Sequence, residues 1–267
     1  MARLNNKHQR SDLLGADAGA TDQRIEAYCM PTHRSLLLGV MALLIAACDF
    51  AGGPSDGSNA IVRPQDFALL PCQSLSEAPH CALAIVGGKR ILFGAPAGVG
   101  WTLPKDDLRQ LDAVVLFALE ADAIEGLDEV RNQSWREGRA APLRVIGPPG
   151  VIEMVTALNN AMEQSDALFV VDNGIPPGGY NAALLEPVEA PQDSRVFDTG
   201  DVVIFRRAAG YQIDYSGRAT ALLEVCGKTP DTGETGSKLA ADVRIACRQE
   251  DDADAWPISA PIFVLRG

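Results

Sequence analysis

Short apolar runs rich in β-branched residues alternate with helix-like segments along the middle of the chain, and this alternation limits the possible folds more than any other feature. Residues 112–117 (DAVVLF) have the composition of a strand buried on both faces, and residues 143–146 predict a second such strand. Residues 127–136 lie between them and predict a helix. Strands joined by helices in this order predict an α/β domain built in layers.

Further elements extend this pattern. Downstream of Pro149, apolar residues recur every three to four positions and predict an amphipathic helix, through Ile152, Val155, Leu158 and Met162. A helical turn is expected within residues 103–110. Strands are expected on both sides of the hairpin signal Gly87-Gly88 within residues 82–93, and at residues 168–171, 201–205, 211–215, 220–225 and 262–265.

An uncharged apolar run, residues 35–47 (SLLLGVMALLIAA), lies directly before Cys48. The run is too short to span a bilayer comfortably. It has the flanks of a secretory signal, and the sequence Ile45-Ala46-Ala47-Cys48 resembles the lipobox of bacterial lipoproteins. The resemblance implies cleavage before Cys48, acylation of that residue, and a domain tethered to a membrane and facing the periplasm. The alternative is a buried core helix followed by a chance cysteine.

These features divide the chain into three parts. Residues 1–47 are expected to be a leader and lipoprotein signal peptide, with Met30 as an alternative start. Residues 48–60 combine the lipidated cysteine with a flexible tether rich in Gly, Ser and Pro. Residues 61–267 are expected to form the folded domain. The formal net charge of −12 disfavours nucleic acid as a partner, because a phosphate backbone would be repelled.

Four cysteines fall in the expected domain, and four cysteines allow three disulfide connectivities. We favour Cys72–Cys81 and Cys226–Cys247, because each pair is close in sequence and closes a short loop. A metal site at these cysteines is the competing interpretation, with His80 as the one histidine nearby. His80 itself is expected to lie in a surface loop.

Two segments, residues 91–103 (ILFGAPAGVGWTL) and residues 111–150, together resemble the metallo-β-lactamase-fold hydrolases, in particular the ribonuclease Z-like branch. In that branch a strand ending in an FDAG-like turn precedes a second strand, which leads into the metal motif H-x-H-x-D-H. A W-x-x-G-R segment and a strand ending in GPPG follow. Residues 210–227 also look like the second half of the family. The resemblance implies an αββα four-layer sandwich.

The same resemblance implies that the metal motif is degenerate. At the positions of the family's metal-motif ligands the chain has Ala118, Glu120, Asp122 and Ala123, of which only Asp122 matches. Lys228 stands where the family has a bridging aspartate, and Gly94 stands where it has the Asp of the FDAG turn.

Histidine is too scarce for the family's zinc centre. The chain contains only His8, His33 and His80, and the first two precede the expected domain. A catalytic zinc usually takes about three protein ligands rich in histidine. No cofactor is therefore expected, and zinc or another divalent metal enters only under the alternative function given below.

Other charged groups have two interpretations each. Glu120, Asp122 and Glu125 could hold a hard cation, but we favour solvated glutamates and an Asp122 that caps a helix beginning near Glu125. The basic pairs Arg136–Arg139 and Arg206–Arg207 could bind an anionic ligand, but structural pairing is the simpler expectation.

The sequence therefore predicts a lipoprotein of the bacterial cell envelope that carries a metallo-β-lactamase-like domain without the zinc ligands. Such a domain would be a non-catalytic binding or scaffolding pseudoenzyme, with an envelope protein or a small ligand as its partner. The alternative is a diverged metal-dependent hydrolase of phosphodiesters or esters that uses the carboxylates around Asp122.

Overall fold

The structure is a computed structural model that describes residues 61–75, 80–226, 240–247 and 254–267. All of these belong to one compact unit, residues 53–267. No helix in the described ranges is long and apolar enough to cross a membrane. The expected leader, Cys48, the tether and Lys228 lie outside the described residues, so the predictions for them stay predictions.

The first sheet has seven strands in the order β13-β1-β2-β3-β4-β5-β6. The strands from β3 to β6 run parallel to one another. The strands β13, β1 and β2 join this parallel part of the sheet through antiparallel pairing. The predicted hairpin at Gly87-Gly88 is confirmed, because both glycines have positive φ and connect β2 to β3. The strand bounds are β1 Phe67–Pro71, β2 Ala82–Val86, β3 Lys89–Phe93, β4 Leu111–Val115, β5 Leu143–Gly147, β6 Leu185–Glu189 and β13 Ile262–Leu265.

The second sheet has six strands in the order β12-β11-β10-β9-β8-β7. Pairing is antiparallel from β7 to β10 and parallel from β10 to β12. The strand bounds are β7 Arg195–Asp198, β8 Val202–Arg207, β9 Gly210–Tyr215, β10 Ala219–Glu224, β11 Val243–Ala246 and β12 Asp254–Ala255.

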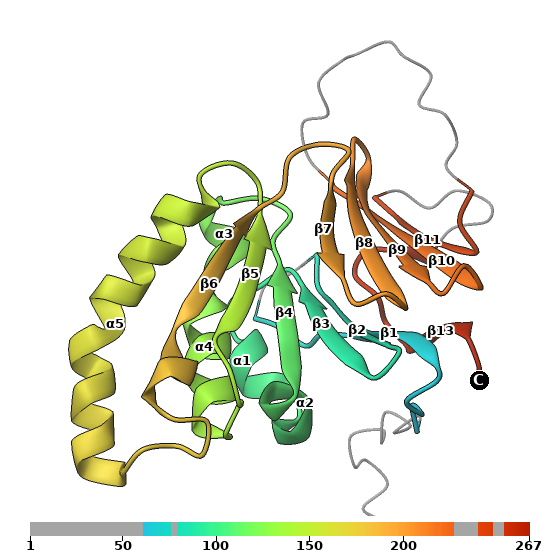
Figure 1. Cartoon of the computed structure of the whole chain (residues 1–267). Coiled ribbons are helices and arrows are strands. Elements are labelled where there is room, and N and C mark those ends of the chain that lie inside the picture. The colour runs from blue at the N-terminus through green and yellow to red at the C-terminus, as the bar shows by residue number, and fades with distance from the viewer. Residues whose placement is uncertain (1–60, 76–79, 227–239, 248–253) are drawn as a thin grey trace, which may run out of the picture. The chain divides into compact units, whose positions relative to one another are not determined.

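The two sheets face each other across a shared apolar core (Figure 1). The core draws on alternate residues of both sheets, including Phe93 and Val115 from the first and Ile204, Tyr211 and Leu223 from the second. The α/β class with two packed sheets, expected from the sequence, is therefore confirmed.

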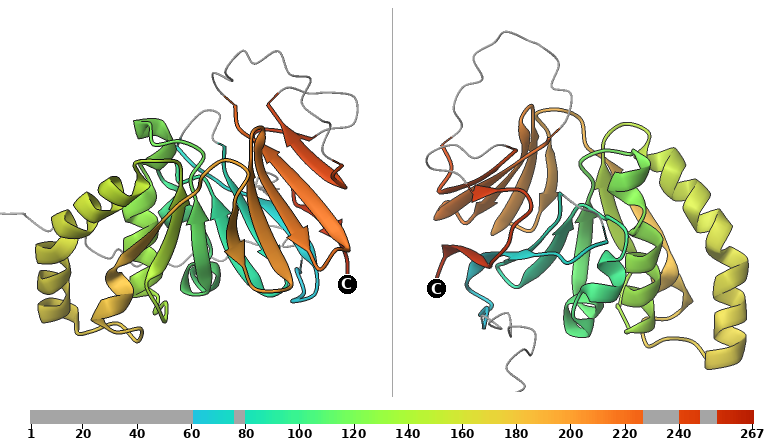
Figure 2. Two further views of the ribbon diagram at one scale, coloured as in Figure 1. Left: turned by 45° about the horizontal axis from the view of Figure 1, so that its top comes forward. Right: turned by 180° about the vertical axis from the view of Figure 1, so that it is seen from behind.

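Helices cover the outer face of the first sheet, as the views in Figure 2 also show. Leu116 and Val114 on the sheet side share a second core with Val99, Leu127 and Val155 on the helical side. This burial on both faces explains the apolar runs Ala113-Val114-Val115 in β4 and Val145-Ile146 in β5. The helical segments are α1 Val99–Thr102, α2 Lys105–Arg109, α3 Ala121–Ile124, α4 Leu127–Arg136, α5 Val151–Asn173 and the 3₁₀ helix η1 Tyr180–Ala183.

The outer face of the second sheet is polar. Gln212 accepts a hydrogen bond from Arg207 (2.9 Å) and donates one to Asp214 (2.9 Å), which also accepts from Thr220 (3.1 Å). Among the described residues no helix packs on this face, so they supply three of the four expected layers. A hydrogen-bonded polar face on an antiparallel sheet can meet water directly.

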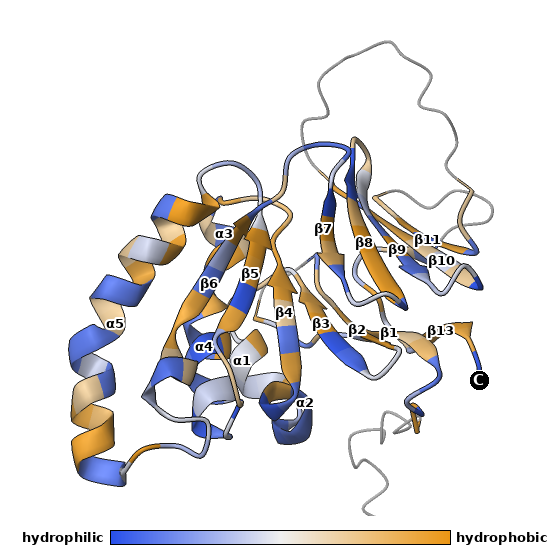
Figure 3. Cartoon of the chain, in the orientation of Figure 1, coloured by the Kyte–Doolittle hydropathy of each residue, from blue (hydrophilic) through white to orange (hydrophobic). Residues whose placement is uncertain are grey.

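The expected strand at residues 168–171 is wrong, because these residues form the last turns of α5. In Figure 3 the helix is banded with hydrophobic and hydrophilic residues along its whole length. Phe169 packs against Trp135 of α4 with 5.4 Å between ring centroids. Gly174, with φ +80°, ends the helix. Tertiary packing thus continues the helix through a short apolar run that periodicity alone could not assign.

A buried ion pair fastens α5 to α4. The Arg131 guanidinium donates to both carboxylate oxygens of Asp166, and the two side chains are 0% and 6% exposed. Nearby, the buried guanidinium of Arg139 donates to the Ala182 carbonyl (2.7 Å) and to the Ser134 hydroxyl (3.1 Å). Burial and then the charge of Arg131 lower the pKa of Arg139 to about 10. Arg139 is therefore structural, as expected.

Asp166→Ala should destabilise the protein by about 3–5 kcal/mol, because it leaves the buried Arg131 charge without its partner. The matched control is Asp106→Ala, which removes the exposed Arg109–Asp106 pair and should cost less than about 1 kcal/mol. Urea unfolding of the two variants measures the difference. Equal losses in both variants would show that the buried pair does not hold α5.

Candidate functional site

Residues 118–123, where the resemblance places the metal motif, follow the carboxyl end of β4, where sites of α/β proteins commonly lie; we term them the motif loop. Ala118 and Ala123 are partly buried in this loop, whereas Glu120 and Asp122 are exposed. Alanine has no donor atom for a metal. The donor set at these positions therefore does not fit the two-zinc centre that the resemblance implies.

The expected capping role of Asp122 is wrong. Asp122 lies inside the short helix α3, and α4 begins at Leu127 with Gly126 as its N-cap and no side-chain cap. A side chain at Gly126 would place Cβ 2.1 Å from the Pro96 carbonyl oxygen. Close backbone packing at Gly126, rather than a side-chain cap, therefore marks the start of α4. The Asp122 carboxylate lies in solvent.

His80 lies in a loop but is half-buried, contrary to the expectation of a surface position. Its ring packs edge-on against Phe117 (6.0 Å between centroids) and Trp256 (5.6 Å), which also contact each other (5.7 Å). With Tyr211, which stacks 5.7 Å from Phe117, these residues form a group that we term the aromatic cluster. Burial lowers the pKa of His80, and the negative charge of Asp122 partly offsets that effect.

Tyr211 ties the two sheets together at this cluster. Its hydroxyl donates to the Leu116 carbonyl (3.0 Å), and burial raises its pKa to about 12. The guanidinium of Arg206 lies 4.7 Å from the Tyr211 ring, and its buried Nη1 has no hydrogen-bond partner among the described residues. Arg207 instead stacks on Phe205. The predicted structural pairing of these arginines therefore involves aromatic rings and an amide rather than carboxylates.

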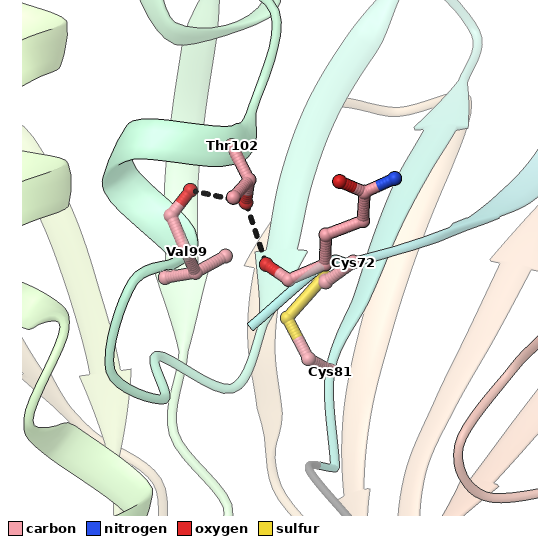
Figure 4. The surroundings of a disulfide bond; sticks show 5 residues. Cys72, Cys81, Val99 and Thr102 are labelled. Carbon is pink, nitrogen blue, oxygen red and sulfur yellow. Dashed lines mark hydrogen bonds between the residues drawn. A yellow bond between two sulfur atoms is a disulfide. The ribbon is translucent and has the colours of Figure 1, made fainter. Parts of the chain in front are cut away.

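Both favoured disulfides are present. Cys72–Cys81 joins the segment after β1 to the start of β2 (Figure 4). Beside it, the Thr102 hydroxyl hydrogen-bonds the Gln73 carbonyl (2.5 Å) and lies 3.2 Å from the Val99 carbonyl. This hydrogen bond fastens the disulfide-linked segment to α1.

The second disulfide, Cys226–Cys247, lies next to His80. A ring nitrogen of His80 and the two sulfur atoms are all within 4.8 Å of one another. The competing interpretation of these cysteines, a metal site with His80, thus has the right residues in one place, although the sulfurs are bonded to each other.

Gly94, in the turn after β3, leaves no space for a side chain. This glycine has φ +79°, and a Cβ there would lie 1.9 Å from the His80 carbonyl oxygen. The segment that brings His80 to the aromatic cluster therefore occupies the space that an aspartate at Gly94 would need.

An apolar groove lies beside the motif loop. It has a volume of about 530 Å³ and is formed by α3, the start of α4 and the middle of α5. Glu125 and Asp128 are the acidic residues of its wall, and the rest of the lining is apolar: Ala121, Ile124, Leu127, Met154, Ala157, Leu158, Ala161 and Met162.

Comparisons with known proteins add a limited similarity. Over 123 residues the chain is 26% identical to ribonuclease Z of Clostridioides difficile (strain 630), which covers 43% of this chain and 40% of that protein. The chain therefore spans about two fifths of the length of the curated relative it matches. This similarity agrees with the resemblance to the ribonuclease Z-like branch. No protein-family profile matches the chain.

Two solved structures are also similar. The metallo-β-lactamase fold protein YhfI from Bacillus subtilis matches with a TM-score of 0.46 and 16% identity, over 68% of this chain and 71% of that chain. The short form of human tRNase Z matches with a TM-score of 0.45 and 17% identity, over 67% and 76% of the two chains.

Sequence reasoning missed Tyr211, Trp256 and the groove. Tyr211 is indistinguishable from any other residue of an expected strand, and Trp256 lies in a turn-rich segment with no periodic pattern. The groove joins α3 to α5 across about 30 residues, and only the packing of the helices creates it.

Gly94→Ala should destabilise the protein by more than about 3 kcal/mol, because it combines a strained backbone with a clash against His80. Gly88→Ala is the matched control: Gly88 has φ +74°, yet nothing lies within 4 Å of its Cβ position. The Gly88→Ala substitution should lower the stability only by its backbone strain, about 1–2 kcal/mol. Thermal unfolding compares the two, and similar losses would mean that the His80 backbone yields easily.

Proposed function

We propose that the chain is a lipoprotein of the bacterial cell envelope whose α/β domain is a non-catalytic binding or scaffolding module. The observation that carries the proposal is that alanines stand at positions 118 and 123 of the motif loop. Ala118 and Ala123 offer no metal ligand. A fold of this kind does not need its metal to remain stable, because its core lies between the sheets and under the helices.

The aromatic packing at the carboxyl end of β4 supports the same proposal. The aromatic cluster packs His80, Phe117, Tyr211 and Trp256 together at the carboxyl end of β4. Aromatic side chains bury large apolar areas, so this packing gives the region an apolar character that does not suit a polar substrate.

The apolar groove offers a place for a ligand. Its volume lies within the roughly 300–1,000 Å³ of small-molecule sites, and its lining is mostly apolar with few polar groups. Met154 and Met162 can adjust to the shape of an occupant, because the methionine side chain is unbranched and flexible.

A diverged metal-dependent hydrolase is the second candidate. It is favoured by the negative charge of Asp122, which partly offsets the effect of burial on the pKa of His80, and by the similarity to a ribonuclease Z. In this candidate the carboxylates of Glu120 and Asp122 would hold the metal. Both side chains are exposed, so solvent rather than a rigid shell of packed residues surrounds their carboxylates.

A hydrolase assay separates the two candidates. The full chain with its disulfides intact, supplied with zinc, manganese or magnesium, should hydrolyse bis-nitrophenyl phosphate and nitrophenyl esters no faster than buffer. Asp122→Ala and the exposed-carboxylate control Asp172→Ala should give the same background rate. Metal-dependent turnover that Asp122→Ala abolishes and Asp172→Ala preserves would establish the hydrolase instead.

The envelope location rests on the apolar run at residues 35–47 and on Cys48. The two disulfides support an oxidising compartment, where such bonds persist. Acyl chains on Cys48 would anchor the domain at about 0.8 kcal/mol per buried CH₂.

Cys48→Ser should move the protein from the membrane fraction to the soluble fraction of a bacterial host, because it removes the acylated thiol. Ser55→Ala, in the expected tether, is the control and should leave the protein in the membrane fraction. Fractionation followed by immunoblotting measures both variants. A Cys48→Ser protein that remains in the membrane fraction would rule out the lipid anchor.

A further inference from the structure

We propose that the chain, once its Cys226–Cys247 disulfide is reduced, binds one thiophilic divalent cation such as Zn²⁺ through the two thiolates and the His80 imidazole. The three ligand atoms already lie within 4.8 Å of one another. Two cysteines and one histidine, with the fourth position open to water, are a donor set known from zinc enzymes. The inference does not rest on the proposed function, because it uses none of the motif-loop residues.

The sheet holds the two cysteines together without help from the disulfide. Cys226 follows β10 and Cys247 follows β11, and these strands are parallel neighbours in which Leu223 pairs with Ile245. The Cα atoms of the two cysteines are 5.2 Å apart. Strand pairing therefore keeps the thiols adjacent after reduction.

Trp256 also holds these two strand ends together. Its indole Nε1 donates to the Glu224 carbonyl (3.0 Å), and its backbone N–H donates to the Ala246 carbonyl (3.2 Å). It thus bonds to the ends of both strands that carry the cysteines. The same indole packs 5.6 Å from His80, so one residue positions all three ligands.

The three ligand atoms need to move only a short distance to bind a metal. With Zn–S bonds of about 2.3 Å and Zn–N bonds of about 2.0 Å, tetrahedral ligand atoms lie about 3.5–3.8 Å apart. After reduction the sulfurs must separate to that distance, which side-chain rotation can supply. Cys247 is exposed, so the metal can enter from solvent and keep a water ligand.

The surroundings suit a metal ligand set. Phe117 and Trp256 cover His80 with apolar rings, and such a shell limits competition from water for the bound ion.

The redox step balances as follows. A dithiol reductant transfers two electrons and two protons to the disulfide, giving two thiols and the oxidised, cyclic disulfide of the reductant. Binding of Zn²⁺ then releases the two thiol protons to solvent and leaves two thiolate ligands. The disulfide and the metal site are therefore mutually exclusive states of the same residues.

Cobalt binding to the full chain tests the proposal, because Co²⁺ bound to thiolates gives charge-transfer absorption. The chain reduced with a phosphine should bind one Co²⁺ that Zn²⁺ displaces, and the oxidised chain should bind none. Cys226→Ser/Cys247→Ser should lose this cobalt, whereas Cys72→Ser/Cys81→Ser should retain it. His80→Asn should weaken binding about tenfold or more, as loss of even an outer-shell partner does.

Several results would overturn the proposal. These are a reduced chain that binds no cobalt, an oxidised chain that binds it equally well, or unchanged binding in Cys226→Ser/Cys247→Ser. If a cysteine variant fails to fold, His80→Asn decides the question, because it retains every cysteine: an unchanged affinity in that variant rejects the site. Since the readout is binding, its failure is distinct from any result of the hydrolase assay.

Discussion

Side chains from the inner faces of the two sheets meet in one apolar layer, and the rest of the structure depends on this contact. Each large side chain buried there contributes about 1.5–3 kcal/mol. Tyr211 shows how the layer also sets the geometry of the strand ends: its ring lies in the core while its hydroxyl bonds to Leu116, just beyond β4. Phe117 and Trp256 then pack beside it, and His80 packs on them. The position of His80 therefore follows from the packing of the sheets.

The segment around His80 determines how tightly the turn after β3 is packed. The Cys72–Cys81 disulfide fastens the segment after β1 to the start of β2, and the His80 carbonyl fills the space above Gly94. A side chain at Gly94 could not be accommodated in that turn without moving this segment.

Patterns that depend on local chemistry were predictable from the sequence. The alternation of apolar runs predicted most strands, the Gly87-Gly88 pair predicted the hairpin, and short separations predicted both disulfides. The failures share a different cause. The run at residues 168–171 is helical because Phe169 meets Trp135, Asp122 does not cap α4 because Gly126 packs on Pro96, and His80 is half-buried because distant rings surround it. Each outcome is decided by a partner far away in the sequence, which no local pattern contains.

The edge strand β6 has a consequence for the solubility of the domain. It closes one side of the first sheet, pairs with β5 alone among the described strands, and has the sequence Leu-Glu-Pro-Val-Glu. An open edge normally offers a row of free backbone donors on which a strand of another molecule can assemble. Pro187 removes one donor from this strand, and Glu186 and Glu189 would place negative charges against any added chain. The sheet therefore ends at β6 with its own protection against growth into intermolecular fibres.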